Sequence, residues 1–398
     1  MPPAPIGRCQ GKFARHSSDI QIRADPAITP RKTFPMTRDY SQFLSPASAD
    51  RSSDTARTLS PLEHLGWQGF FSQQTDLDEM ASHPPVRITE VNRSGLRAMG
   101  DGIDMVIPPG PEATVGDWLM LDAELPTHSR VLERKSLIRR RAPGKDRKVQ
   151  LIAANIDTMF VVTSCNADFN VARLERFIAM AFDAEVTPVI VLTKIDLCDD
   201  LEPYVTQAKA ISDLVEVVPL NAKSETAREA LAPWVRAGQT IAFLGTSGVG
   251  KSTLTKALGD DLDIATQGIR EDDARGRHTT TRRQLYFIAN GCGVLDTPGM
   301  RELQLTDAAS GVGDVFADLE ELATQCRFRN CAHEGEPGCA VQAGIAAGEV
   351  DAGRLDRWRK LAAEEAFNSA SLAQKRAKDK SFGKMVKTAK TIKKRSRK

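Results

Sequence analysis

One run of eight residues constrains this chain more than any other, because it matches the phosphate-loop pattern G-x-x-x-x-G-K-[ST] at every position: Gly245-Thr246-Ser247-Gly248-Val249-Gly250-Lys251-Ser252. Residues 240–244 before it predict a buried strand, and residues 253–258 after it begin a helix. At such a turn, backbone amides bind an anion, Lys251 reaches the β- and γ-phosphates, and Ser252 ligates magnesium. The pattern predicts a nucleoside triphosphate site; a glycine-rich turn with a chance Lys-Ser pair is the alternative.

Two motifs farther along the chain fit the γ-phosphate end of such a site. Asp296-Thr297-Pro298-Gly299 follows a predicted strand and has the form D-x-x-G, in which Asp296 reaches magnesium through water and the Gly299 amide meets the γ-phosphate. The run Thr279-Thr280-Thr281 lies between the two phosphate motifs and can supply a magnesium hydroxyl, for which we choose Thr280. Each motif is weak alone, but together, in register after a phosphate loop, they are a strong indication of one site.

The base-reading motif favours guanine. Thr193-Lys194-Ile195-Asp196 follows a predicted buried strand and approximates N-K-x-D, in which the carboxylate accepts both the ring N–H and the exocyclic amine of guanine. After the next predicted strand comes Asn221-Ala222-Lys223, where a backbone amide can meet the guanine carbonyl. Both motifs precede the phosphate loop, the reverse of the usual GTPase order. The sequence therefore predicts a circularly permuted domain, which is possible where chain termini lie close together.

A C-terminal cluster of metal-ligand residues has the spacing C-x4-C-x-H-x5-C. Its members are Cys326, Cys331, His333 and Cys339. Three thiolates and one imidazole on a short loop match a closed tetrahedral zinc site with a structural role. Reduced cysteines in a loop are the alternative. The seven cysteines are an odd number in a chain without a secretion signal, which argues against disulfides.

We predict a multidomain fold with an N-terminal β-barrel of the oligonucleotide-binding (OB) kind, a central α/β P-loop GTPase domain and a C-terminal helical zinc-binding domain. Short strands broken by turns suggest the barrel, although another small β domain has the same pattern. Residues 59–80 before it have the spacing of a short helix, with Ser60-Pro61 as its cap and first helical position. The predicted bounds are 1–58 for a disordered extension, 59–138 for helix and barrel, 139–305 for the GTPase domain, 306–370 for the zinc domain and 371–398 for a basic tail.

Charge is concentrated at the C-terminus. The chain has a net charge of +2, but residues 374–398 hold twelve Lys or Arg and one Asp. Such a tail either docks on nucleic acid or only keeps the protein solvated. The basic segment 139–148 is either a solvated linker or a contact to a phosphate backbone. No apolar run is long enough for a membrane span, so we expect a cytoplasmic protein that has no membrane partner.

The residue that activates water is the hardest to assign. Many small GTPases carry a Gln after D-x-x-G, but here Met300 and Arg301 follow Gly299. We predict that His278 orients the attacking water, because it lies in the loop expected to close over the γ-phosphate and a neutral imidazole accepts a hydrogen bond. A polar loop histidine without nucleotide contact is the alternative.

With these motifs, and with Ala154-Asn155-Ile156-Asp157 and Gly276-Arg277-His278, the chain from Leu59 onward resembles the RsgA (YjeQ) family of circularly permuted ribosome-biogenesis GTPases. The resemblance implies that residues 245–253, including Thr253, and 193–196 contact GTP, that the Cys/His cluster binds zinc, and that His278 orients water. It also implies that the small subunit stimulates hydrolysis. Thr193 stands where the family usually has Asn, and Asn221 where Ser is common.

The function we predict is a GTPase that binds the small (30S) ribosomal subunit and its rRNA and assists late maturation, with hydrolysis to GDP and phosphate releasing the protein. The predicted cofactors are one structural Zn²⁺ and Mg²⁺ with GTP, and the predicted state is a monomer. Two alternatives stay open: an RNA-binding assembly factor that uses guanine nucleotide as a switch with negligible turnover, and an unrelated ATPase.

Overall fold

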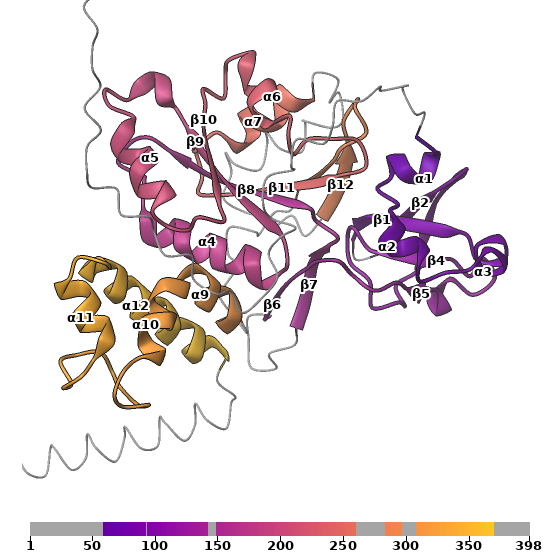
Figure 1. Cartoon of the computed structure of the whole chain (residues 1–398). Coiled ribbons are helices and arrows are strands. Elements are labelled where there is room, and N and C mark those ends of the chain that lie inside the picture. The colour runs from indigo at the N-terminus through magenta and orange to yellow at the C-terminus, as the bar shows by residue number, and fades with distance from the viewer. Residues whose placement is uncertain (1–58, 93, 142–148, 260–282, 297–307, 370–398) are drawn as a thin grey trace, which may run out of the picture. The chain divides into compact units, whose positions relative to one another are not determined.

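The computed structural model describes residues 59–92, 94–141, 149–259, 283–296 and 308–369 (Figure 1). The predicted N-terminal extension, His278 to Thr281, Thr297 to Gly299 and the predicted basic tail lie outside the described residues. Across these ranges, every helix is too short or too polar to cross a lipid bilayer.

Five parallel neighbours form the centre of the main sheet, in the order β10-β9-β8-β11-β13. Their bounds are Glu216–Pro219 (β10), Thr187–Thr193 (β9), Thr158–Ser164 (β8), Thr240–Leu244 (β11) and Gly293–Asp296 (β13). Strand β8 is buried along its whole length. Its alternate residues belong to two separate cores, with Met159 and Val161 in one and Phe160 and Val162 in the other. Burial on both faces explains why these strands are continuous apolar runs.

Helices cover both faces of these strands (Figure 1). The helices are α4 (Val171–Asp183), α5 (Glu202–Lys209), α6 (Thr226–Leu231) and α7 (Lys251–Leu258). Helix α4 begins at Asn170, whose side chain accepts the Arg173 N–H, and it buries Leu174, Phe177 and Ile178 at helical spacing. The prediction of an α/β layered domain with a mainly parallel sheet is confirmed.

The single helix predicted over residues 59–80 is wrong, because the structure has three short helices there. They are α1 (Pro61–His64), α2 (Gly69–Ser72) and α3 (Leu77–Ser82). Ser60 caps α1 in a capping box with Glu63. The break comes at Gly66, whose φ of +91° is left-handed, and a Cβ there would lie 2.4 Å from the Arg87 guanidinium.

The N-terminal sheet consists of β1 to β5, which pair antiparallel in the order β3-β2-β1-β4-β5. Their bounds are Pro85–Val91 (β1), Leu96–Gly100 (β2), Ile103–Ile107 (β3), Trp118–Met120 (β4) and Arg130–Val131 (β5). Strand β1 also pairs with β12 (Arg283–Phe287), which pairs with β13, so one sheet of eleven strands results.

The predicted closed OB barrel is not confirmed, since the strand pairs found among the described residues include none between β3 and β5. The register of β1 against β2 shifts between Ile88 and Glu90. Such a bulge bends a strand and increases its twist. The first residues of β1 pair with β4, and Glu90 and Val91, beyond the bulge, pair with β12.

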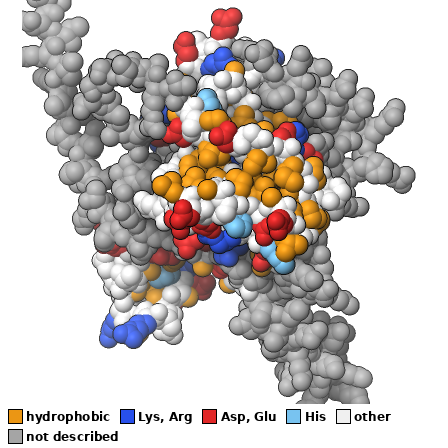
Figure 2. Space-filling model, turned by 90° about the vertical axis from the view of Figure 1, so that its right-hand side faces the viewer, with side chains coloured by type: hydrophobic (Ala, Val, Ile, Leu, Met, Phe, Trp, Pro, Cys, Tyr) orange, Lys and Arg blue, Asp and Glu red, His pale blue; other side chains and the backbone are white. Residues whose placement is uncertain are grey.

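Figure 2 shows one face of the molecule on which hydrophobic side chains gather, with acidic and His side chains at their margin. Among the exposed large apolar residues of the N-terminal helices and of the turn before η2 (Pro126–His128) are Phe70, Leu77 and Leu125.

The segment predicted as a basic linker begins as a strand. Residues 139–141 end β6 (Leu137–Arg141), which pairs antiparallel with β7 (Val149–Ala154). Residues 142–148 between the two strands lie outside the described part. Ile138 of β6 and Ile152 of β7 are both buried in the same core as α4. Their burial holds this pair of strands against the main sheet.

Four helices follow the sheet: α9 (Ala309–Val315), α10 (Ala317–Thr324), α11 (Ala340–Ala346) and α12 (Ala352–Ser369). Helix α9 packs closely on α4, because a Cβ at Gly311 would lie 2.0 Å from the carbonyl oxygen of Ala179. Glu175 of α4 is 1% exposed. Its carboxylate accepts a hydrogen bond from Arg357 Nε at 2.9 Å and forms a longer ion pair with Arg354 at 3.6 Å. Burial raises the pKa of Glu175, while Arg357 and Arg354 oppose the shift.

Gly311→Ala tests this close approach. The added methyl group must push α9 away from the α4 backbone, so we expect the free energy of unfolding to fall by about 1–3 kcal/mol in urea titrations followed by circular dichroism. Gly69→Ala is the matched control, since a Cβ at that helical glycine meets no atom within 4 Å. Equal stability of the two variants would contradict the packing described.

Candidate nucleotide and metal sites

The phosphate loop joins β11 to α7 and is shaped by its glycines. Gly245 has a φ of +155°, and a Cβ there would lie 2.3 Å from the Val162 carbonyl oxygen of β8. Gly250 has a φ of +102° and caps α7. The Lys251 ammonium donates to the carbonyl oxygens of Gly245 at 2.8 Å and Thr246 at 2.6 Å, so it lies over the loop. This places a cation and a helix N-terminus together, as anion binding requires.

Strand β9, which carries the start of the predicted base-reading motif, meets the phosphate loop at Thr193. This residue is fully buried, and its hydroxyl lies 2.6 Å from the Val249 carbonyl oxygen and 3.1 Å from that of Thr163. A Cβ at Gly250 would lie 3.8 Å from Thr193 and 3.7 Å from Ala222. The loops that follow β10 and β11 therefore both lie close to the end of β9. The structure brings the two halves of the predicted site together despite their inverted order in the chain.

The rest of the base-reading residues form two tight turns. Lys194 has a left-handed φ of +58° and leads into η3 (Ile195–Leu197), which leaves Asp196 exposed. After the neighbouring strand β10, the Asn221 side chain accepts the Lys223 N–H at 2.9 Å and closes a turn. Around the phosphate loop, Ser247, Gly248 and Ser252 are exposed and Thr246 and Thr253 are half-buried. The contacts of all these residues to a nucleotide stay predictions.

The γ-phosphate motif begins at the same edge of the sheet. Strand β13 pairs in parallel with β11, with Leu295 opposite Ala242, so Asp296 follows one residue farther toward the phosphate loop. Gly299, Thr280 and His278 lie outside the described residues, and their roles stay predictions.

The four predicted zinc ligands come together. The Cys326 and Cys339 sulfur atoms lie 3.9 Å apart, and each lies 3.5 Å from His333 Nδ1. With Cys331, all ligand atoms lie within 4.8 Å of one another. A tetrahedral zinc ion with bonds of about 2.3 Å to sulfur and about 2.0 Å to nitrogen separates its ligand atoms by about 3.5–3.8 Å. The donor set and its spacing therefore fit zinc.

Residues around the cluster hold it in shape, and the sequence analysis missed one of them, Glu336. The Glu336 carboxylate accepts N–H groups from Ala332 at 2.7 Å, Glu334 at 2.9 Å and Gly335 at 3.2 Å. These hydrogen bonds lower the pKa of Glu336 to about 2. The His333 ring lies 5.7 Å from that of Trp358, and burial lowers the pKa of His333, which favours the neutral imidazole that a metal needs. One acidic residue within a cysteine-rich loop gives no local sequence signal of this role.

Known proteins match most of the chain. The RsgA GTPase family model matches residues 131–306. The small ribosomal subunit biogenesis GTPase RsgA 2 of Vibrio parahaemolyticus is 44% identical over 332 residues, which cover 83% of this chain and 92% of that protein. RsgA of Mesorhizobium japonicum is 48% identical over 316 residues, or 77% of this chain and 91% of that protein. The crystal structure of YjeQ from Thermotoga maritima covers 70% of this chain and 97% of its own, with a TM-score of 0.52 at 24% identity.

A parallel sheet that joins a phosphate loop to base-reading strands placed earlier in the chain defines a circularly permuted P-loop GTPase. The solved YjeQ structure supports this fold. The chain belongs to the RsgA GTPase family, and its enzymatic class is GTP hydrolase.

Thr193→Val tests the contact between the two halves of the nucleotide site. Valine keeps the shape but leaves the Val249 carbonyl without the Thr193 hydroxyl, so we expect the affinity for a fluorescent GDP analogue to fall by about 1 kcal/mol, or roughly fivefold. Thr187→Val, at the opposite end of β9, is the control and should bind GDP as the unchanged protein does. Equal affinity of both variants would show that the hydroxyl does not shape the site.

The metal prediction is tested by analysis of bound metal. We expect one zinc ion per purified chain and its loss in His333→Ala, because three thiolates alone leave a tetrahedral site incomplete. A chelator should speed hydrogen exchange across residues 326–346. Cys198→Ser, which removes a cysteine outside the cluster, should keep the metal. Metal-free protein with slow exchange in this region would contradict a structural zinc site.

Proposed function

We propose that this chain is a GTPase that binds the small ribosomal subunit and its rRNA, assists late maturation of that subunit, and leaves it when GTP is hydrolysed to GDP and phosphate. The observation that carries the proposal is the contact of Thr193 with the phosphate loop in a chain that is 44–48% identical to proteins named small ribosomal subunit biogenesis GTPases. Such work implies a cytoplasmic protein, and we propose that it acts as a monomer.

The residues at the sheet edge take distinct roles in this proposal. Asp196 accepts the guanine N–H groups, and the Ala222 amide meets the guanine carbonyl. Lys251 leaves the carbonyls of its own loop to bind the β- and γ-phosphates. Lys251 then donates to charged phosphate oxygens instead of neutral carbonyl oxygens. This favours nucleotide binding, because hydrogen bonds to ionised groups are stronger.

Magnesium fits the first turn of α7, where the Ser252 hydroxyl is exposed. When bound with GTP, magnesium neutralises charge that develops on the phosphates. Ser252, Thr280 and Asp296 would hold it, the first and second through hydroxyl oxygens and the third through water. The Gly299 amide meets the γ-phosphate, and His278 orients the attacking water by accepting its hydrogen bond.

Two features support an RNA-bearing partner. Residues 374–398 carry twelve basic side chains against one acidic one, which suits a phosphate backbone. The four ligands of the Cys/His cluster would fill a tetrahedral zinc site, so its role is to hold the loop between the C-terminal helices in shape for a partner. We propose that tail, zinc loop and N-terminal sheet share the contact with the small subunit.

GTP turnover titrated with purified small ribosomal subunits tests the proposal. We expect turnover to rise with subunit concentration and to be lost in Lys251→Ala, because the phosphates lose their ammonium partner. Lys256→Ala, which removes an exposed lysine from the same helix, is the control. Subunit binding without any turnover would favour the nucleotide-switch alternative, and tighter binding of ADP than of GDP would favour the ATPase.

A further inference from the structure

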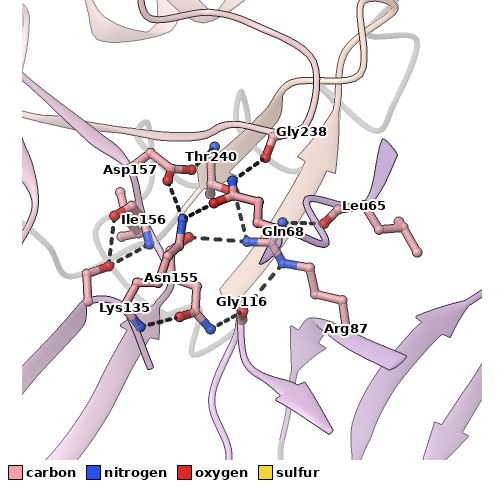
Figure 3. A network of polar contacts seen from close by, with 11 residues as sticks. Leu65, Gln68, Arg87, Gly116, Lys135, Asn155, Ile156, Asp157, Gly238 and Thr240 are labelled. Atoms are coloured by element: carbon pink, nitrogen blue, oxygen red, sulfur yellow. Dashed lines mark hydrogen bonds and ion pairs between the residues drawn. The ribbon is translucent and has the colours of Figure 1, made fainter. Parts of the chain in front are cut away.

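A buried arginine joins the N-terminal strands to the strand that leads into the phosphate loop (Figure 3). Arg87 of β1 is 1% exposed, and its guanidinium donates to the Leu65 carbonyl, to the Gly116 carbonyl at 3.4 Å, to the Asn155 carbonyl at 3.3 Å and to the Thr240 hydroxyl at 2.8 Å. The first two acceptors belong to the N-terminal part, Asn155 lies in the segment between β7 and β8, and Thr240 is the first residue of β11. One side chain therefore spans the junction.

The motif Ala154-Asn155-Ile156-Asp157, which has no assigned part in nucleotide binding, completes this junction. Asn155 has a left-handed φ of +56°, is 2% exposed, and donates from its side chain to the Gly116 carbonyl at 3.0 Å. The Asp157 carboxylate accepts Lys135 Nζ at 2.6 Å and the Thr240 N–H at 2.7 Å. The motif thus binds both the N-terminal part and the first residue of β11.

Thr240 is the point where these contacts converge. Its N–H and C=O pair with Asp157, and its hydroxyl accepts from Arg87. Strand β11 runs from Thr240 to Leu244, directly into Gly245 of the phosphate loop, and is hydrogen-bonded on both sides, to β8 and β13. A short strand held in this way transmits a shift of one end to the other, since it can neither bend nor slip alone.

The charge of Arg87 makes the junction intolerant of displacement. Its partners are neutral carbonyl and hydroxyl oxygens, and the nearby Asp157 carboxylate acts on it only through space. Burial lowers its pKa to about 10, so it stays charged at neutral pH. A shift of the N-terminal strands would take acceptors from a buried charge, which is strongly unfavourable. The N-terminal strands and β11 therefore share one favoured relative placement.

We propose that Arg87 and Asp157 are positioning residues that couple the N-terminal sheet to the phosphate loop through Thr240, so that nucleotide binding and partner binding to the N-terminal sheet are thermodynamically linked. Linkage is reciprocal, so a nucleotide that fixes the phosphate loop also fixes the N-terminal junction. This inference rests on the proposed nucleotide site, but it requires no ribosomal subunit.

Hydrogen exchange of the full chain with and without GDP tests the coupling. We expect GDP to slow exchange in peptides that cover residues 61–72 and 85–91, which lie outside the nucleotide site. In Thr240→Val the Arg87 acceptor is lost while the strand keeps its shape, so the GDP-dependent slowing there should fall by about half or more. Thr240→Ser restores a hydroxyl and should restore the slowing.

Thr89→Val is the matched control, because it removes a buried hydroxyl of the same strand β1 whose bond, to the Arg97 carbonyl, stays within the N-terminal sheet. It should keep the full GDP-dependent slowing. Exchange at residues 61–91 that ignores GDP in the unchanged protein, or equal slowing in Thr240→Val and Thr89→Val, overturns the coupling. Absence of GDP binding, measured beforehand by fluorescence, would instead overturn the nucleotide site.

Discussion

Parallel pairing of β9, β8 and β11 is the constraint on which the nucleotide site depends. Parallel strands end at the same edge of a sheet, so the loops that follow them meet in space whatever their order in the chain. Thr193 ends β9, the phosphate loop follows β11, and the hydroxyl of Thr193 lies 2.6 Å from the Val249 carbonyl oxygen. A circularly permuted chain can therefore form the same nucleotide site, because the positions of the strands in the sheet, and not their order in the chain, bring the loops together.

The features predicted correctly are those that a short window of sequence determines. The phosphate loop needs its glycines within eight residues, and β9 is a continuous apolar run because helices cover both its faces. The Cys/His cluster also lies within one short segment, and its ligand atoms meet within 4.8 Å. In each case local spacing and chemistry leave few alternative structures.

The features missed depend on contacts between distant residues. The break at Gly66 follows from the Arg87 guanidinium, 21 positions along the chain, which occupies the place of a Cβ. The pairing of β1 with β12 joins Glu90 to Gln284, almost 200 positions apart, and the sequence analysis did not predict it. Arg87 itself is one basic residue in a strand, and residue patterns do not reveal that its acceptors are carbonyl and hydroxyl oxygens. Contacts between residues so far apart in the chain leave no periodic pattern in a short stretch of sequence, so sequence analysis does not detect them.

Among the described residues, the flanking parts contact the nucleotide-bearing sheet away from the edge that carries the phosphate loop. The N-terminal part contacts Asp157, which directly precedes β8, and Thr240, the first residue of β11, whereas the phosphate loop follows the last residue of β11. The C-terminal helices pack on α4, through Glu175 and the close approach at Gly311. A partner that touches either part would act on the loops through these buried strands and helices. The stiffness of those strands and helices would then determine how strongly such a partner affects the loops of the nucleotide site.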